Sequence, residues 1–166
     1  KDADNIEGEE VVVNTGAICV GWACWVNKKI HKTLTHFAKG LPVQPAAIEG
    51  NEYQKARAIM FMTEENEQVT LEGNSGGIVD GIDELIVKVK TRARDPKNSG
   101  YIFPKVKLEN TSYVNTKGKT IYKVSLPIVA WCDMNGVVQP EEAEAVQHQS
   151  EAAPEAPVSR KRKKAA

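Results

Sequence analysis

The sequence predicts a mainly β protein, built either as one small antiparallel barrel of the OB-like type or as a β-sandwich, with at most one short helix. About seven short runs of β-branched and aromatic residues follow one another at intervals of about 8–12 residues. Clusters of Gly, Asn, Asp and Pro separate these runs, as turns do. The chain has 166 residues, of which 41% are hydrophobic, and this is enough for one domain with tails.

Each predicted strand is a run with high β propensity that is bounded by turn residues. The predicted strands are residues 11–13, 17–26, 56–63, 68–72, 78–94, 101–108, 112–114 and 120–131. Residues 17–26 are apolar on both faces, which favours a central strand. Pro127 interrupts the last run, because proline donates no ladder hydrogen bond. Residues 28–39 fit either a short helix or a turn, and a helical turn is also compatible with residues 80–85.

Three segments follow from the composition. Residues 1–10 read as an acidic, flexible N-terminus, and residues 11–138 form the β domain. Residues 139–166 are rich in Glu, Ala, Gln and Pro, which predicts a disordered acidic linker that ends in the basic tip 160–164.

The formal net charge of zero conceals a strong segregation of charge. Residues 49–84 carry nine acidic and two basic side chains, whereas residues 88–123 carry ten basic and two acidic ones, a net +8. A basic surface of this size attracts polyanions unless the acidic segment lies against it. No apolar run approaches the length of about 20 residues that spans a bilayer, so no membrane is expected as a partner. Three cysteines fit a reducing compartment, and the expected location is the cytoplasm, or the host cytoplasm for a viral protein.

Two motifs resemble reactive sites, but neither predicts an enzyme. The loop around Ser75 is similar to the nucleophile loop of chymotrypsin-like proteases, but the His and Asp that this family needs upstream lack their usual context. Four residues, Cys19, Cys24, His31 and His36, have the ligand types of a zinc site, but their middle spacer is too short. Cys19 and Cys24 are better explained as small buried residues of a core strand. We therefore expect neither a cofactor nor a metal.

The most informative feature is the alternation of basic and smaller side chains over residues 88–94. Successive side chains of a strand point to opposite faces, so a strand here would carry all the cations on one face. The cations in question are Lys88, Lys90, Arg92 and Arg94.

Two further strands have a similar pattern. Within residues 101–107, one face would carry Tyr101, Phe103, Lys105 and Lys107. Within residues 120–126, Ile121 and Lys123 alternate with Tyr122, Val124 and Leu126, so Lys123 is expected to face outward. If the three strands are neighbours, they form one basic sheet face with aromatic side chains.

Cations that contact phosphates and aromatic rings that stack on bases are the ingredients of single-strand nucleic-acid binding. We therefore expect a non-enzymatic protein that binds single-stranded DNA through this face, with Trp22 as an additional stacking candidate. The overall pattern is similar to that of viral or plasmid single-strand binding proteins, which would imply a role in replication, although the basic tip departs from their usual acidic end.

The alternative is a viral or plasmid structural β-sandwich that docks an acidic protein partner. The tail could bind a further protein, and the sequence is compatible with a homo-oligomer.

Overall fold

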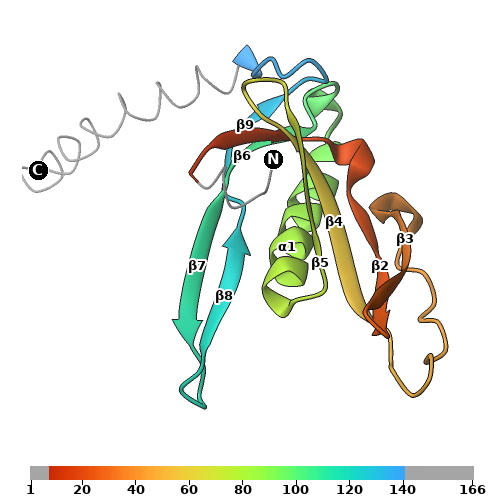
Figure 1. Cartoon of the computed structure of the whole chain (residues 1–166). Helices are drawn as coiled ribbons and strands as arrows, with labels where there is room; N and C mark the ends of the chain where they lie inside the picture. The colour runs from red at the N-terminus through yellow and green to blue at the C-terminus, as the bar shows by residue number, and fades with distance from the viewer. Residues whose placement is uncertain (1–7, 141–166) are drawn as a thin grey trace, which may run out of the picture.

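The computed structural model describes residues 8–140, so most of the expected N-terminal and C-terminal tails lies outside the described residues. In this part the chain forms nine strands and one α-helix, and the predicted mainly β class is confirmed (Figure 1). The helix is α1 (Gly76–Ala93). The strands are β1 (Glu10–Val13), β2 (Cys19–Val26), β3 (Lys29–His36), β4 (Gln54–Met62), β5 (Gln68–Gly73), β6 (Phe103–Lys107), β7 (Glu109–Val114), β8 (Thr120–Ser125) and β9 (Ile128–Cys132). Within residues 8–140, no helix has the length and hydropathy needed to cross a bilayer.

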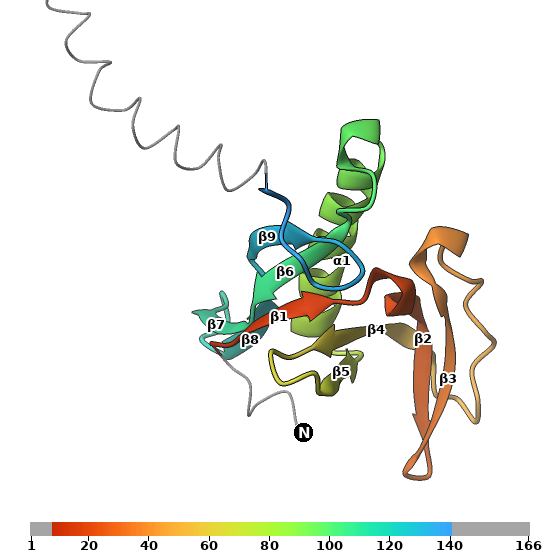
Figure 2. The ribbon, with the colours of Figure 1, turned by 90° about the horizontal axis from the view of Figure 1, so that it is seen from above.

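Seven strands form one antiparallel sheet in the order β3-β2-β4-β1-β6-β9, with β5 paired to β4. β7 and β8 form a separate two-stranded ribbon. The strands β3 and β9 end the large sheet without meeting, so the OB-like barrel, the first of the two predicted arrangements, is not formed. Both views place the β7–β8 ribbon and the β2–β3 hairpin on opposite sides of α1 (Figures 1 and 2).

Local turn chemistry explains two of the strand boundaries. Most of the ambiguous residues 28–39 form β3, because Asn27 and Lys28 adopt positive φ angles of 49° and 65° and close a tight hairpin with β2. The last three, Phe37–Lys39, form a short 3-10 helix. Pro127 divides the long strand predicted for residues 120–131 into β8 and β9, which belong to different sheets.

The largest correction to the predicted secondary structure is α1, because residues 78–94 were expected to be mainly strand. The side chain of Ser75 caps this helix by accepting a hydrogen bond from the backbone N–H of Ile78 at 3.4 Å. The buried residues of α1 recur every three or four positions, which is the helical period; they are Val79, Ile82, Leu85, Ile86 and Val89, with Gly81. The alternation within residues 87–94 obscures this longer period.

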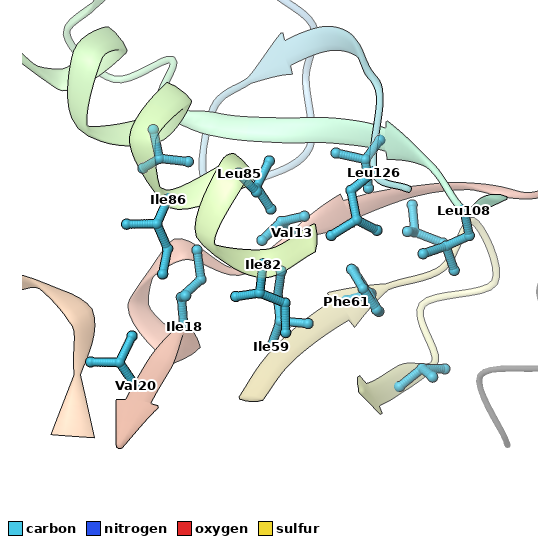
Figure 3. Close-up of a cluster of buried hydrophobic side chains, with 14 of the residues drawn as sticks. Val13, Ile18, Val20, Ile59, Phe61, Ile82, Leu85, Ile86, Leu108 and Leu126 are labelled. Carbon is cyan, nitrogen blue, oxygen red and sulfur yellow. The ribbon is translucent and has the colours of Figure 1, made fainter. Parts of the chain in front are cut away.

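The hydrophobic core lies between α1 and one face of the large sheet. Ile82 and Leu85 of α1 are fully buried against Val13 of β1 and Phe61 of β4 (Figure 3). Val11 and Val13 face this core, so the intervening Val12 lies on the opposite face of the sheet.

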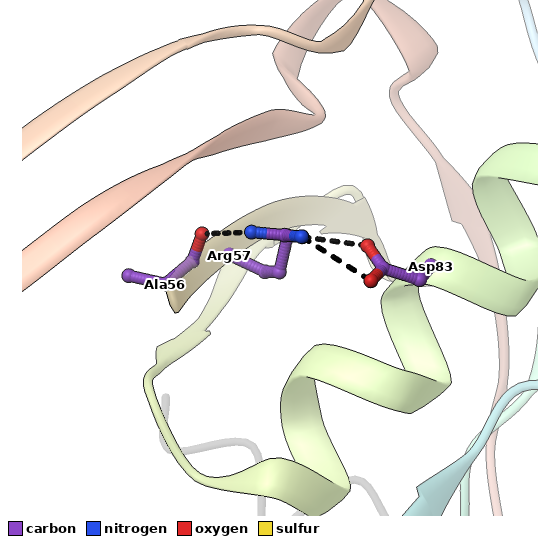
Figure 4. A network of polar contacts seen from close by, with 3 residues as sticks. All are labelled: Ala56, Arg57 and Asp83. Atoms are coloured by element: carbon purple, nitrogen blue, oxygen red, sulfur yellow. Dashed lines mark hydrogen bonds and ion pairs between the residues drawn. The ribbon is translucent and has the colours of Figure 1, made fainter. Parts of the chain in front are cut away.

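An ion pair between a buried arginine and a partly exposed aspartate also joins α1 to the sheet. The Arg57 side chain on β4 is 6% exposed, and its Nε and Nη2 donate to the two carboxylate oxygens of Asp83 at 2.6 and 3.2 Å (Figure 4). Its Nη1 donates to the carbonyl oxygen of Ala56 at 2.9 Å. This two-pronged contact fixes the position of α1 across β4, because a buried guanidinium needs its partner carboxylate.

On its other side, α1 approaches the backbone of β8 through two glycines. A Cβ atom on Gly77 would lie 2.2 Å from the carbonyl oxygen of Tyr122, and one on Gly81 would lie 2.4 Å from that of Val124. Real Cβ atoms do not come this close to backbone atoms, so a side chain at either position would separate α1 from β8. The two glycines therefore set the distance between the helix and the ribbon.

We expect Gly81→Ala to lower the free energy of unfolding by about 1–3 kcal/mol, because the new methyl group overpacks the helix against β8. The matched control is Gly76→Ala, since a Cβ atom there meets nothing within 4 Å. The control should leave stability unchanged or slightly raised, because alanine favours helix. Urea denaturation followed by circular dichroism measures both variants, and equal stability of the two would refute this close approach.

Candidate nucleic-acid interface

The expected row of cations on a strand is not formed, because all of its members lie on the last turns of α1. Neighbouring residues of an α-helix are separated by about 100°, so alternate residues point about 200° apart. Lys88 therefore shares one side of α1 with Arg92, while Lys90 and Arg94 share a nearly opposite side. Positive charge at the C-terminal end of a helix also has an ordinary structural cause, its attraction to the helix dipole.

Arg92 is a structural residue. Its guanidinium carbon lies 4.8 Å from the centre of the Trp131 ring, over which it stacks. Its Nε donates to the carbonyl oxygen of Tyr101 at 3.3 Å, and its Nη2 donates to the side-chain oxygen of Gln139. These contacts join the end of α1 to the segments beside β6 and β9. They also remove Arg92 from the candidate binding residues.

The other three cations of α1 remain accessible. Lys88 and Arg94 are exposed, and neither has a carboxylate partner within residues 8–140. Lys90 is exposed as well, with its Nζ 5.9 Å from the centre of the Phe37 ring. Together they make the C-terminal end of α1 basic on two sides, and we refer to this end as the basic area.

The predicted alternation on β6 is confirmed. Pro104 and Val106 point into the core, whereas Phe103, Lys105 and Lys107 lie on the face of the sheet opposite α1. Tyr101 precedes the strand and is half-buried.

Carboxylates neutralise this face of the sheet. The Nζ of Lys105 lies 3.6 Å from a carboxylate oxygen of Glu10, and the Nζ of Lys107 lies 3.8 Å from one of Glu109. Exposed Glu64 and Glu65, from the acidic segment 49–84, line a hollow together with Lys107. Both ion pairs therefore use carboxylates outside the acidic segment 49–84, which contributes Glu64 and Glu65 to the hollow.

Lys123 turns toward α1 instead of toward open solvent. Its Nζ donates to a carboxylate oxygen of Glu84 at 2.5 Å. This hydrogen bond, with the charge of Glu84, raises the pKa of Lys123 above its ordinary value. Since β6 belongs to the large sheet and β8 to the ribbon, the three predicted segments do not form one basic sheet face.

The β7–β8 ribbon carries the most exposed tyrosines among the described residues. Tyr122 is 74% exposed and Tyr113 is 57% exposed. Tyr113 pairs with Ile121, the neighbour of Tyr122, so the two tyrosines lie on opposite faces of the ribbon. Their exposure places each ring where a planar ligand can stack on it.

The turn of this ribbon carries two exposed lysines, Lys117 and Lys119, without carboxylate partners within residues 8–140. The side chain of Asn115 accepts hydrogen bonds from both of their backbone N–H groups, at 3.0 and 2.9 Å, which orders the turn. Sequence reasoning placed these lysines and Tyr113 outside the predicted contact set. Their signal was the same alternation of aromatic and basic residues that identified Tyr122.

The ribbon and the first turn of α1 enclose a hollow of about 480 Å³. Its lining includes Tyr113, Tyr122 and Lys123 from the ribbon. Gly76 and Gly77 contribute from the start of α1, where backbone N–H groups favour anions. Asp80 also lines the hollow and opposes this preference.

The cysteines and histidines of the β2–β3 hairpin do not converge. Cys19 pairs with His36 and Cys24 pairs with His31, and these two pairs lie on opposite faces of the hairpin. Within residues 8–140, no group of three or more His, Cys, Asp or Glu is arranged to hold a metal ion. Trp22, the additional stacking candidate, is half-buried and donates its indole N–H to the carbonyl oxygen of Pro42 at 2.7 Å.

The comparisons with known proteins add no family to this description. No protein-family profile, no curated protein and no solved structure matches the chain.

The contacts of Arg92 lead to a stability prediction that separates it from its neighbours. We expect Arg92→Gln to lower the free energy of unfolding by about 2 kcal/mol, because a charged donor to two acceptors and a cation–π contact are lost. Arg94→Gln is the control and should change stability by less than about 0.5 kcal/mol. Thermal denaturation of both variants checks this, and similar melting temperatures would show that Arg92 is not structural.

Proposed function

We propose that this protein binds single-stranded nucleic acid, DNA in the first instance, without catalysing a reaction, and that the β7–β8 ribbon is its main contact surface. The observation that carries the proposal is the exposure of Tyr113 and Tyr122 on a ribbon whose turn holds Lys117 and Lys119. The ribbon stands outside the large sheet (Figure 1), and both tyrosines remain exposed although α1 packs against β8.

The physical basis is stacking combined with charge. Every base has a flat aromatic face, so stacking on tyrosine tolerates any sequence and contributes about 1–3 kcal/mol per base. Lysines beside the rings contact phosphates and release counterions. The hollow between the ribbon and the start of α1 gives a nucleotide stacked on Tyr113 a place next to Lys123.

The basic area at the C-terminal end of α1 gives a secondary contact. Lys88 to Arg94 lie 11–17 residues beyond Gly77, which is about 17–26 Å along the helix axis at about 1.5 Å per residue. A single strand that extends from the ribbon along α1 could meet Lys88 or Arg94. The face of β6 is excluded from this path because of its carboxylates.

The test is the affinity for a fluorescein-labelled oligo(dT), measured by anisotropy at about 50 mM salt. We expect Tyr122→Ala to weaken binding by about 5- to 150-fold, which corresponds to the loss of about 1–3 kcal/mol of stacking. The matched control is Trp25→Ala, because Trp25 is 55% exposed but lies on the β2–β3 hairpin, on the other side of α1. The control should leave the affinity unchanged.

The salt dependence gives a second measurement on the same ribbon. Replacing Lys117 and Lys119 by Gln should reduce the log–log salt slope by about 0.7 for each phosphate contact that is lost. The same change at Lys28 and Lys29, the exposed lysines at the β2–β3 turn, should not alter the slope. Absence of oligo(dT) binding by the full chain would contradict the proposal and favour the alternative, an assembly protein that docks an acidic protein partner.

A further inference from the structure

The face of the large sheet opposite α1 carries a groove with an apolar floor. The groove has a volume of about 550 Å³. Val12 on β1 is the register partner of both Met62 on β4 and Lys105 on β6, so these three side chains form one row across the sheet. Phe103 lies two residues from Lys105 on the same face, and Met134, which is 80% exposed, stands at the edge of the groove. Val12, Met62 and Phe103 are half-buried, so part of their apolar surface is open to the groove.

Carboxylates surround this floor. Glu10 and Glu64 line the groove, and they also line an adjacent hollow together with Glu9 and Glu65. Against these four acids stand Lys105 and Lys107, which leaves a net charge of −2, from four negative and two positive charges. Of the four glutamates, Glu10 alone has a cationic partner among the described residues. An acidic rim repels nucleic acid and attracts cations, so the occupant of this groove must be basic and partly apolar.

The chain itself contains such a segment. Residues 158–164 read Val-Ser-Arg-Lys-Arg-Lys-Lys, which is one β-branched apolar residue followed by five consecutive cations. No other stretch of the sequence has five cations in a row. Val158 matches the apolar floor in character, and the cations after it match the unpaired carboxylates of the rim in charge.

The place where the described chain ends makes this contact reachable. The backbone N–H of Gln139 donates to the carbonyl oxygen of Trp131 at 2.9 Å, and the turn just before it, with Met134 to Gly136, lines the groove. The chain therefore leaves the domain close to the groove. From Pro140 to Arg160 there are 20 residues, which span at most about 70 Å when extended. Tethering of this kind raises the effective concentration of the segment, which compensates for weak individual ion pairs.

We propose that the groove between β1, β4 and β6 is the docking site for the basic C-terminal segment 158–164 of the same chain. Docking brings Val158 onto Met62 and Phe103 and places the basic side chains against Glu9, Glu64 and Glu65. This inference does not depend on the proposed nucleic-acid binding, because it concerns the opposite charge on a different face. The basic tip then binds the domain of its own chain and not a nucleic acid.

The test uses nuclear magnetic resonance on the ¹⁵N-labelled full chain, without nucleic acid. A tail variant with residues 160–164 all changed to Gln is compared with the original chain. We expect the amide signals of Val12, Met62 and Phe103 to shift between the two, while those of the β7–β8 ribbon stay in place. Raising the salt to about 1 M, where the Debye length is about 3 Å, should move the original spectrum toward that of the tail variant.

Variants of the domain complete the test. Glu64→Gln with Glu65→Gln should remove the difference that the tail makes, whereas Glu49→Gln with Glu52→Gln, on the loop before β4, should preserve it. Val158→Ser should reduce the shifts at Met62 and Phe103. The proposal is overturned if the tail variant leaves the groove signals unchanged, or if Glu64→Gln with Glu65→Gln has no effect. Shifts that grow with protein concentration would also overturn it, because they would show docking between copies.

Discussion

The packing of α1 between the large sheet and β8 is the contact on which the other features depend. One face of the open sheet would be bare without the helix, because this single element supplies the apolar stripe that completes the core. Two constraints fix its position: the Arg57–Asp83 ion pair holds it to β4, and Gly77 and Gly81 let it reach the backbone of β8. The ribbon has no hydrogen-bonded place in the large sheet, so its orientation follows from this helix contact.

The fold places side chains of opposite charge on different surfaces of the domain. The ribbon and the end of α1 carry lysines and arginines without carboxylate partners among the described residues, while the sheet face opposite α1 carries the unpaired glutamates. Lys105 and Lys123 are engaged with Glu10 and Glu84, which are far from them in the sequence. A neutral chain thus presents surfaces of opposite sign, one suited to a polyanion and the other to a basic peptide.

Apart from β3, whose residues had also fitted a helix or turn, the strands were predicted well because their alternation and their turn residues are local. The sequence predicted the break at Pro127 but not its consequence, that β8 leaves the sheet. The helix was missed because the Lys-Val alternation after Leu85 imitates a strand, although the spacing of Ile82, Leu85, Ile86 and Val89 and the cap at Ser75 were present. The ion pairs of Lys105 and Lys123, and the stacking of Arg92 on Trp131, depend on tertiary contacts that no local pattern contains.

We propose that the ribbon, and not the face of β6, contacts single-stranded nucleic acid. Titration of the ¹⁵N-labelled full chain with unlabelled oligo(dT) tests it most directly, because the amide signals report each strand separately. We expect the largest shifts within residues 109–125 and at Gly76 and Gly77, with small changes at Lys88 and Arg94. Largest shifts at Phe103 and Lys105, or no shifts at all, would contradict it.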